Sequence, residues 1–208
     1  MNVLAIGAHF DDVELGCGGS LARHIAEGDK VTIYVATDSG YGTYNGKSIR
    51  DSKTAYAEGQ RAAALLGTEL ICGSQKTFEL EFGEETNVAL VKIIEEKKIN
   101  CIYTHWGGDV HHDHFNLAKA SLHVSRHVPR VLMYRSNWYT SDEVFREEFF
   151  VDITNTWEIK KQMILCHESE HNRVGDKWVE YFENDARNNG LKIGVGMEEV
   201  FQIVKWLV

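Results

Sequence analysis

The stretch Ala8-His9-Phe10-Asp11-Asp12-Val13-Glu14 follows a short apolar run, Val3-Leu4-Ala5-Ile6-Gly7. The apolar run predicts a buried strand, and the acidic stretch predicts the end of that strand and the start of a helix. In an open α/β sheet, ligands bind at the carboxyl ends of the strands. A histidine and two adjacent carboxylates have little structural reason to crowd this place. We therefore expect an active site here.

Beyond this stretch, strand-like and helix-like segments alternate. Apolar runs typical of strands cover residues 3–8, 30–37, 70–72, 100–104, 130–134 and 149–153. Helical spacing covers residues 15–27, 52–66, 86–98, 114–126, 157–169 and 177–188. This order predicts a single α/β domain over 1–208, with a doubly wound, largely parallel sheet and helices on both faces. The segment from about 136 onward fits an appended part that caps the substrate.

The composition is that of an ordinary globular protein. The 208 residues are 43% hydrophobic and 25% charged, enough for one well-cored domain. The 31 acidic residues outnumber the 22 basic ones, which gives a net charge of −9. Nucleic-acid-binding proteins normally present a basic face, so we expect no nucleic-acid partner. A small-molecule substrate, including a nucleotide-linked one, stays compatible because a local arginine can hold an anion.

The cysteines and the first residues of the sequence bear on the cellular compartment in which we expect the protein. Cys17, Cys72, Cys101 and Cys166 lie far apart and form no C-x-x-C pair, which argues against a disulfide framework. No basic segment precedes the first apolar run, and no run approaches the roughly 20 apolar residues of a transmembrane helix. We therefore expect a cytoplasmic protein without a membrane span. Assembly into a homo-oligomer stays open.

A second polar cluster, His111-His112-Asp113-His114, follows the predicted strand at 100–104 through a short loop. If both strands share the parallel sheet, the two clusters face one crevice. His9, Asp12 and one histidine of the second cluster then provide two imidazoles and one carboxylate. This set suits zinc in a catalytic site, with a position left for water.

Two groups remain for proton transfer. Asp11 can take a proton from water that a metal activates, and His111 can stabilise the oxyanion and protonate a leaving amine. Together these groups predict amide hydrolysis. The plain structural alternative is that Asp11 caps the helix beginning near Val13 and that the histidines are solvated. That alternative leaves Asp12 beside His9 unexplained.

Both clusters resemble the signature motifs of a known family. Gly7-Ala8-His9-Phe10-Asp11-Asp12-Val13-Glu14, with Gly16-Cys17-Gly18-Gly19, is similar to the A-H-P-D-D-x-E motif of the zinc-dependent N-acetylglucosaminyl de-N-acetylases, the PIG-L or LmbE-like family. His111-His112-Asp113-His114 resembles its H-P-D-H motif. Weaker matches follow at three further places, 58–67, 167–169 and 197–201. The resemblance spans nearly the whole chain and implies a Rossmann-like fold.

Carried over position by position, the resemblance implies three zinc ligands, namely His9, Asp12 and His114. Asp11 would be the general base, His111 the acid or oxyanion donor, and Asp113 the carboxylate that orients His111. The implied activity removes an acetyl or other small acyl group from an N-acylated amino sugar or from its nucleotide or glycoside conjugate. Zinc is the expected metal, with Fe²⁺, Mn²⁺ and Co²⁺ as alternatives.

Three positions depart from the family's pattern. Phe10 and His112 replace the prolines of the two motifs, and His112 adds a histidine of open role. Ala55 stands where the family often carries an arginine, three residues before Glu58. The substrate contacts of that arginine must then come from elsewhere. The candidate substrate-binding residues are Arg50, Arg187 and, as rings that stack on a sugar, Tyr41 and Trp106.

Two other functions stay open. The first is a catalytically inactive sugar- or nucleotide-binding module on the same fold, against which the retained Asp11 and His111 argue. The second is a metalloprotease, because His167-Glu168-Ser169-Glu170-His171 is a literal H-E-x-x-H. The alternating strands and helices argue against a protease. The glycines within 16–19 come too late for a dinucleotide fingerprint, and we expect them to allow close packing of the helix.

Overall fold

Seven strands form one sheet in a computed structural model that describes residues 1–208, and β1, the first apolar run, is the middle one of its five parallel strands. In spatial order they are β5 (Glu69–Gln75), β2 (Lys30–Thr37), β1 (Asn2–Gly7), β6 (Cys101–His105), β7 (Arg130–Tyr134), β9 (Glu198–Trp206) and β8 (Phe149–Asp152). The first five are parallel, whereas β9 runs antiparallel to both β7 and β8. The predicted, largely parallel sheet is confirmed.

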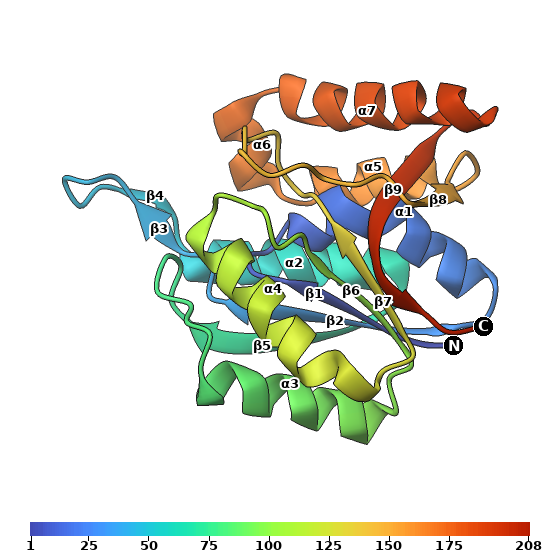
Figure 1. Ribbon diagram of the computed structural model, residues 1–208. Helices are drawn as coiled ribbons and strands as arrows, with labels where there is room; N and C mark the ends of the chain where they lie inside the picture. The colour runs from blue at the N-terminus through green and yellow to red at the C-terminus, as the bar shows by residue number, and fades with distance from the viewer.

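Helices cover both faces of this sheet (Figure 1). They are α1 (Asp12–Ala26), α2 (Ser52–Leu66) and α5 (Trp157–Leu165) on one face, α3 (Glu84–Lys97) and α4 (His112–Val124) with the short η1 (Ser125–His127) on the other, and α6 (Glu168–Val174) and α7 (Lys177–Ile193) outside α5. Val3 and Ala5 of β1 belong to the apolar core under α1 and α2. The alternate residues Leu4 and Ile6 belong to the core under α3 and α4. Burial on both faces explains why β1 is a continuous apolar run.

The strand order places the two polar clusters side by side. From β1 the chain adds β2 and then β5 in one direction, and later adds β6 and β7 in the other. The order therefore reverses between β1 and β6, which is where open α/β sheets bind ligands. The acidic stretch follows the end of β1, and the histidine cluster follows the end of β6 and starts α4.

Three local features differ from the expected elements. The C-terminal strand β9 was not expected, because polar residues interrupt its apolar pattern. Between β2 and α2, where no strand was expected, β3 (Tyr41–Gly42) and β4 (Ser48–Arg50) form a projecting hairpin. The helix expected over 157–169 ends at Leu165, and the turn that follows buries His167 completely. None of the helices combines the length and apolarity that crossing a membrane requires.

Gly16 lets α1 approach β7 closely, as expected for the glycines of this helix. A Cβ atom on Gly16 would lie 2.1 Å from Cδ2 of Tyr134. The Tyr134 ring is fully buried, and its hydroxyl donates a hydrogen bond of 2.7 Å to the carbonyl of Ile6, so it has no room to move. At Gly18 the nearest atom would be Cγ of Lys160 at 3.5 Å, an ordinary contact.

We predict that Gly16→Ala lowers the free energy of unfolding by about 1–3 kcal/mol, because the added methyl group overpacks the core. Gly18→Ala is the matched control. It should leave stability unchanged or raise it by up to about 1 kcal/mol, since alanine favours the helix. Urea denaturation of both variants measures the difference. Equal losses at the two positions would contradict the packing argument.

Candidate active site

A pocket of about 590 Å³ opens where the carboxyl ends of β1 and β6 meet. Its lining comes from the acidic stretch, the histidine cluster, the hairpin region and the turn around residue 78. The segments 136–139 and 170–178 complete it. The lining residues central to the site are His9, Asp11, Asp12, His111 and His114. The structure thus brings together two motifs that lie about a hundred residues apart in the chain.

Three side chains, those of His9, Asp12 and His114, converge at the base of this pocket. Nδ1 of His9 lies 3.3 Å from Oδ2 of Asp12 and 3.2 Å from Nε2 of His114. Nε2 of His114 lies 3.2 Å from Oδ1 of Asp12. A tetrahedral ion about 2.0–2.1 Å from each ligand would space its ligand atoms about 3.3–3.4 Å apart. The residues present therefore fit a divalent metal ion.

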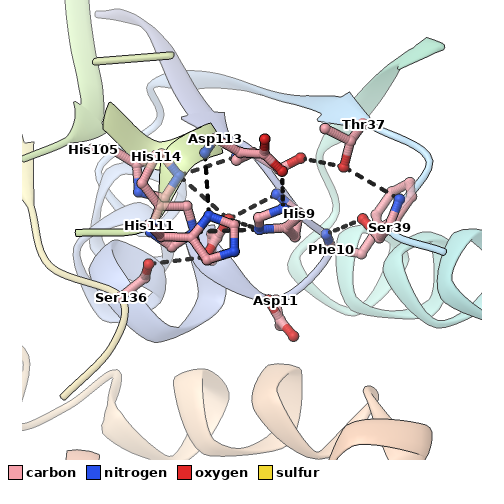
Figure 2. Close-up of polar contacts among 12 residues, drawn as sticks. His9, Phe10, Asp11, Thr37, Ser39, His105, His111, Asp113, His114 and Ser136 are labelled. Carbon is pink, nitrogen blue, oxygen red and sulfur yellow. Dashed lines mark hydrogen bonds and ion pairs between the residues drawn. The ribbon is translucent and has the colours of Figure 1, made fainter. Parts of the chain in front are cut away.

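A buried carboxylate supports each imidazole of this set, and Figure 2 shows Asp113, the one beside His9. Oδ2 of Asp113 lies 2.8 Å from Nε2 of His9, and Oδ2 of Asp109 lies 2.9 Å from Nδ1 of His114. Such carboxylates fix the tautomer and the ring orientation of a metal-binding histidine. Asp113 was expected to orient His111, and this was wrong. It lies in the first turn of α4, from which its carboxylate reaches His9.

His111 is held by the backbone instead. It occupies the N-cap position of α4, and its Nδ1 accepts a hydrogen bond of 3.2 Å from the N–H of Asp113. Because Nδ1 is an acceptor, the ring proton resides on Nε2. No protein group hydrogen-bonds to Nε2, and the ring lines the pocket. His111 therefore offers a free N–H donor.

Sequence reasoning missed three members of this cluster: Asp109, His105 and Ser136. Oγ of Ser136 donates a hydrogen bond of 2.8 Å to Asp12. The ring of His105 stacks on His114 with centroids 4.0 Å apart, and its Nε2 accepts from the N–H of Ala8 at 3.0 Å. Asp109 follows β6 as Asp11 follows β1, and this position was the available signal. His105 ends β6 and Ser136 follows the end of β7, so the same positional signal applies to both.

The charges of the cluster favour a cation. Burial opposes protonation of His114 and His9, but the neighbouring carboxylates outweigh it and raise the pKa of His114 to about 10 and that of His9 to about 9. Despite burial, the imidazoles of His114 and His105 hold the pKa of Asp12 well below its usual value. A site that binds protons this tightly also attracts a metal ion, which would displace them.

Asp11 stands apart from the imidazoles (Figure 2). It is the N-cap residue of α1, yet its side chain makes no capping hydrogen bond, so the capping alternative does not account for it. Its backbone has φ 131° and ψ −28°, a strained conformation that costs a non-glycine residue roughly 1–3 kcal/mol. Burial, opposed by Arg50 and reinforced by Asp12, raises the pKa of Asp11 to about 7.

Arg50, at the end of β4, lies beside Asp11 in a buried polar network. Its Nη1 is 3.5 Å from Oδ2 of Asp11, and its Nη2 donates a hydrogen bond of 2.8 Å to Glu58. Ser169 donates two hydrogen bonds of 2.7 Å to the same glutamate. Nδ1 of His167 lies 3.2 Å from Nη2 of Arg50. Arg50 thus lines the pocket and pairs with Glu58. The arginine that the family often carries three residues before this glutamate is Ala55 here.

The H-E-x-x-H pattern does not form a shared site. His167 contacts Arg50, whereas Nε2 of His171 lies 3.3 Å from Asp176. The first histidine precedes α6 as its N-cap and the second lies within α6. The two imidazoles therefore have separate partners, and the protease alternative loses its ligand pair.

The remaining candidate substrate-binding residues lie in different places. Tyr41 lines the pocket, and its hydroxyl donates a hydrogen bond of 2.7 Å to Glu170. Trp106 is buried and packs edge-on against Phe145. Arg187 lies on α7, where it pairs with Glu183 at 3.1 Å. The structure does not bring Trp106 or Arg187 to the pocket.

Comparison with known proteins identifies the family. Residues 4–125 match the family model described as PIG-L: GlcNAc-PI de-N-acetylase. The chain is also similar to the uncharacterized deacetylase YaiS of Escherichia coli K12, with 33% identity over 167 residues, 71% of this chain and 84% of that protein. The chain therefore belongs to the PIG-L family of deacetylases, as its two motifs predicted.

Solved structures share the fold at lower identity. The N,N'-diacetylchitobiose deacetylase from Pyrococcus horikoshii superposes with a TM-score of 0.82 and 22% identity, covering 98% of this chain and 83% of that one. The 4-carboxy-2-hydroxymuconate hydratase from Pseudomonas putida superposes with a TM-score of 0.79 and 18% identity, covering 100% of this chain and 98% of that one. One fold thus carries a deacetylase and a hydratase, so the reaction must be argued from the site.

We predict that Glu58→Ala destabilises the protein by about 3–5 kcal/mol, because it removes the 2.8 Å ion-pair partner of the buried Arg50 and leaves only the longer ion pair with Asp11 at 3.5 Å. The matched control is Glu69→Ala, which removes the exposed ion pair with Lys97 at 2.7 Å and should cost less than about 1 kcal/mol. Chemical denaturation compares the two. A loss at Glu58 no larger than that at Glu69 would contradict a buried network.

Proposed function

We propose that the protein is a zinc-dependent hydrolase that removes an acetyl or another small acyl group from an N-acylated amino sugar, free or as a nucleotide or glycoside conjugate. The observation that carries this proposal is the convergence of His9, Asp12 and His114, at 3.2–3.3 Å from one another, beside the uncommitted carboxylate of Asp11. Membership of the PIG-L family supports it. The diacetylchitobiose deacetylase with the same fold supports the amino-sugar class.

The residues divide the chemistry between them. His9, Asp12 and His114 would hold the ion, oriented by the carboxylates of Asp113 and Asp109. Zinc in such a site lowers the pKa of water to about 7 and polarises a carbonyl. Two imidazoles and one carboxylate leave room for water and substrate. His9, Asp12 and His114 line one pocket, whereas the two supporting carboxylates lie buried behind the imidazoles.

Asp11 is the group best placed to take the proton from the attacking water. Its carboxylate makes no capping hydrogen bond, lines the pocket and follows the metal-binding stretch directly. The strained backbone at φ 131° holds it there. Arg50, 3.5 Å away, stabilises its charged form against burial. After attack, the protonated Asp11 is the nearest source of a proton for the leaving amine.

His111 stabilises the oxyanion in this proposal. Its Nδ1 accepts the backbone hydrogen bond from Asp113, so Nε2–H is its single proton and faces the pocket. An N–H donor aimed at a developing oxyanion lowers the barrier of acyl transfer. Releasing that proton to the amine would leave an imidazolate. The hydrogen bonding therefore favours oxyanion donor over acid among the two roles expected for His111.

We further propose that the segment from residue 136 onward closes over the substrate. Residues 136–139 and 170–178 line the pocket together with the metal-binding stretch. The same part of the chain also contributes β8 and β9 to the main sheet. Cap and sheet are therefore continuous, which holds the cap at a defined place above the reacting groups.

We predict that the purified protein binds one zinc ion and that His114→Ala abolishes this binding. Asp109→Asn should weaken zinc binding by about 10–100-fold, because the Asp109 carboxylate orients the imidazole of His114. His112→Ala is the matched control, since the His112 side chain is 47% exposed and is not one of the proposed metal ligands. Competition with a chromogenic chelator measures the affinities. Unchanged affinity in His114→Ala would refute the assignment of the ligands.

We predict that the zinc-loaded protein releases acetate from at least one of N-acetylglucosamine, diacetylchitobiose, a nucleotide-linked N-acetylglucosamine or an N-acetylglucosaminyl glycoside. Asp11→Asn should lower kcat by about 100-fold or more with the metal content unchanged, because a general base contributes about 10²–10⁴. Asp142→Asn, in an exposed loop, is the control. Sugar binding by the zinc-loaded protein without acetate release would instead favour the inactive binding module.

A further inference from the structure

Phe78 has features that a core aromatic residue does not have. Its φ of 69° lies in the left-handed region, which is unfavourable for any residue except glycine and is rare for an aromatic one. Its side chain is 56% exposed, and it belongs to none of the buried apolar clusters. Glycine would suit this backbone, and a polar residue would suit this exposure. Neither the fold nor the core explains the aromatic ring.

The backbone around Phe78 is tied to the candidate metal site. Its N–H donates a hydrogen bond of 2.8 Å to Oδ2 of Asp113, and the N–H of Leu80 donates one of 3.3 Å to Oδ1. Oδ2 of Asp113 also lies 2.8 Å from Nε2 of His9. One fully buried carboxylate therefore fixes both a proposed metal ligand and the turn that carries the ring. These hydrogen bonds stabilise the left-handed conformation.

The ring itself lies against the proposed oxyanion donor. It stacks on His111 with centroids 5.5 Å apart and an interplanar angle of 25°. It meets Tyr41 edge-on, with centroids 6.3 Å apart and an angle of 84°. All three rings line the pocket. The exposed surface of Phe78 thus forms an apolar wall next to the place where the amide must react.

We propose that Phe78 determines specificity by packing against the apolar face of a pyranose, so that ring-closed amino sugars bind in preference to open-chain acetamides. The inference deepens the proposed function and rests on it. The face of an aromatic ring carries negative potential. The axial C–H groups of a glucosamine-type pyranose present a flat apolar face that complements it. An open-chain acetamide has no such face to present.

The test compares Phe78→Gly with Phe78→Trp on a ring-closed and an open-chain probe of the same amino sugar: methyl N-acetyl-β-glucosaminide and N-acetylglucosaminitol. Phe78→Gly should raise KM for the glycoside about tenfold, a change equivalent to about 1.4 kcal/mol. Its kcat should stay within about threefold, and kcat/KM for the alditol should not change. Phe78→Trp should keep the wild-type preference, because it retains an aromatic face.

A second measurement does not depend on turnover. Calorimetric titration of the metal-free protein with the glycoside should show a Kd about tenfold higher in Phe78→Gly than in wild type. Lys98→Gly is the matched control: Lys98 also has a positive φ, 53°, and is exposed, but it ends α3 away from the pocket. Both glycine variants should unfold at the same or higher urea concentration than wild type, and only Phe78→Gly should lose affinity.

The outcomes separate this inference from the proposed function. Unchanged KM and Kd in Phe78→Gly, with acetate release intact, overturn the role of Phe78 and leave the deacetylase standing. Equal losses of kcat/KM for glycoside and alditol also overturn it, because the ring would then only support His111. If the wild type releases no acetate but Phe78→Gly weakens binding of the glycoside and Lys98→Gly does not, the role of Phe78 in sugar binding stands and the proposed deacetylase activity fails.

Discussion

Parallel pairing of β1 with β6 is the constraint on which the site depends. The register Val3↔Cys101 to Ala5↔Tyr103 sets the ends of the two strands side by side, and each strand then delivers its own polar cluster to the same edge. Neither cluster forms a site alone, because His9 and Asp12 come from one and His114 from the other. Burial of both faces of β1 drives this pairing, so the apolar core and the polar site arise from the same strand.

The buried carboxylates determine what each neighbouring group can do. Asp113 and Asp109 take up the outer nitrogens of the two imidazoles and so turn their inner nitrogens toward Asp12. Ser136 and the N–H of His9 also donate to Asp12, which leaves it little freedom. Both nitrogens of His9 and His114 and both oxygens of Asp12 thus have a partner in place. Asp11 differs because its backbone conformation directs it away from this network and toward Arg50, which leaves it available for proton transfer.

Much of the fold and part of the site could be predicted from sequence, for identifiable reasons. Apolar runs marked the parallel strands, and polar residues at their carboxyl ends marked the pocket. β9 was missed because Glu198 and Glu199 open it and are buried through tertiary contacts that no local pattern records. The partner of Asp113 was wrong because the role was carried over from the family resemblance, which implies His111, whereas the packing of α4 beside β1 brings the carboxylate to His9. The strain at Phe78 depends on hydrogen bonds from a distant segment, so local sequence does not indicate it.

The shared fold of a deacetylase and a hydratase shows that the sheet positions chemistry without choosing it. In this chain the reaction depends on a few side chains between the ends of β1 and β6, where the strand order reverses, and on the hydrogen bonds that link them. Asp113 contacts His9 through one oxygen and the turn at Phe78 through both, while its own N–H holds His111. A displacement of this one residue would disturb the proposed metal ligand His9, the proposed oxyanion donor His111 and the pocket wall at Phe78 together. These three proposed roles are therefore mechanically coupled through the first turn of α4, where Asp113 is completely buried.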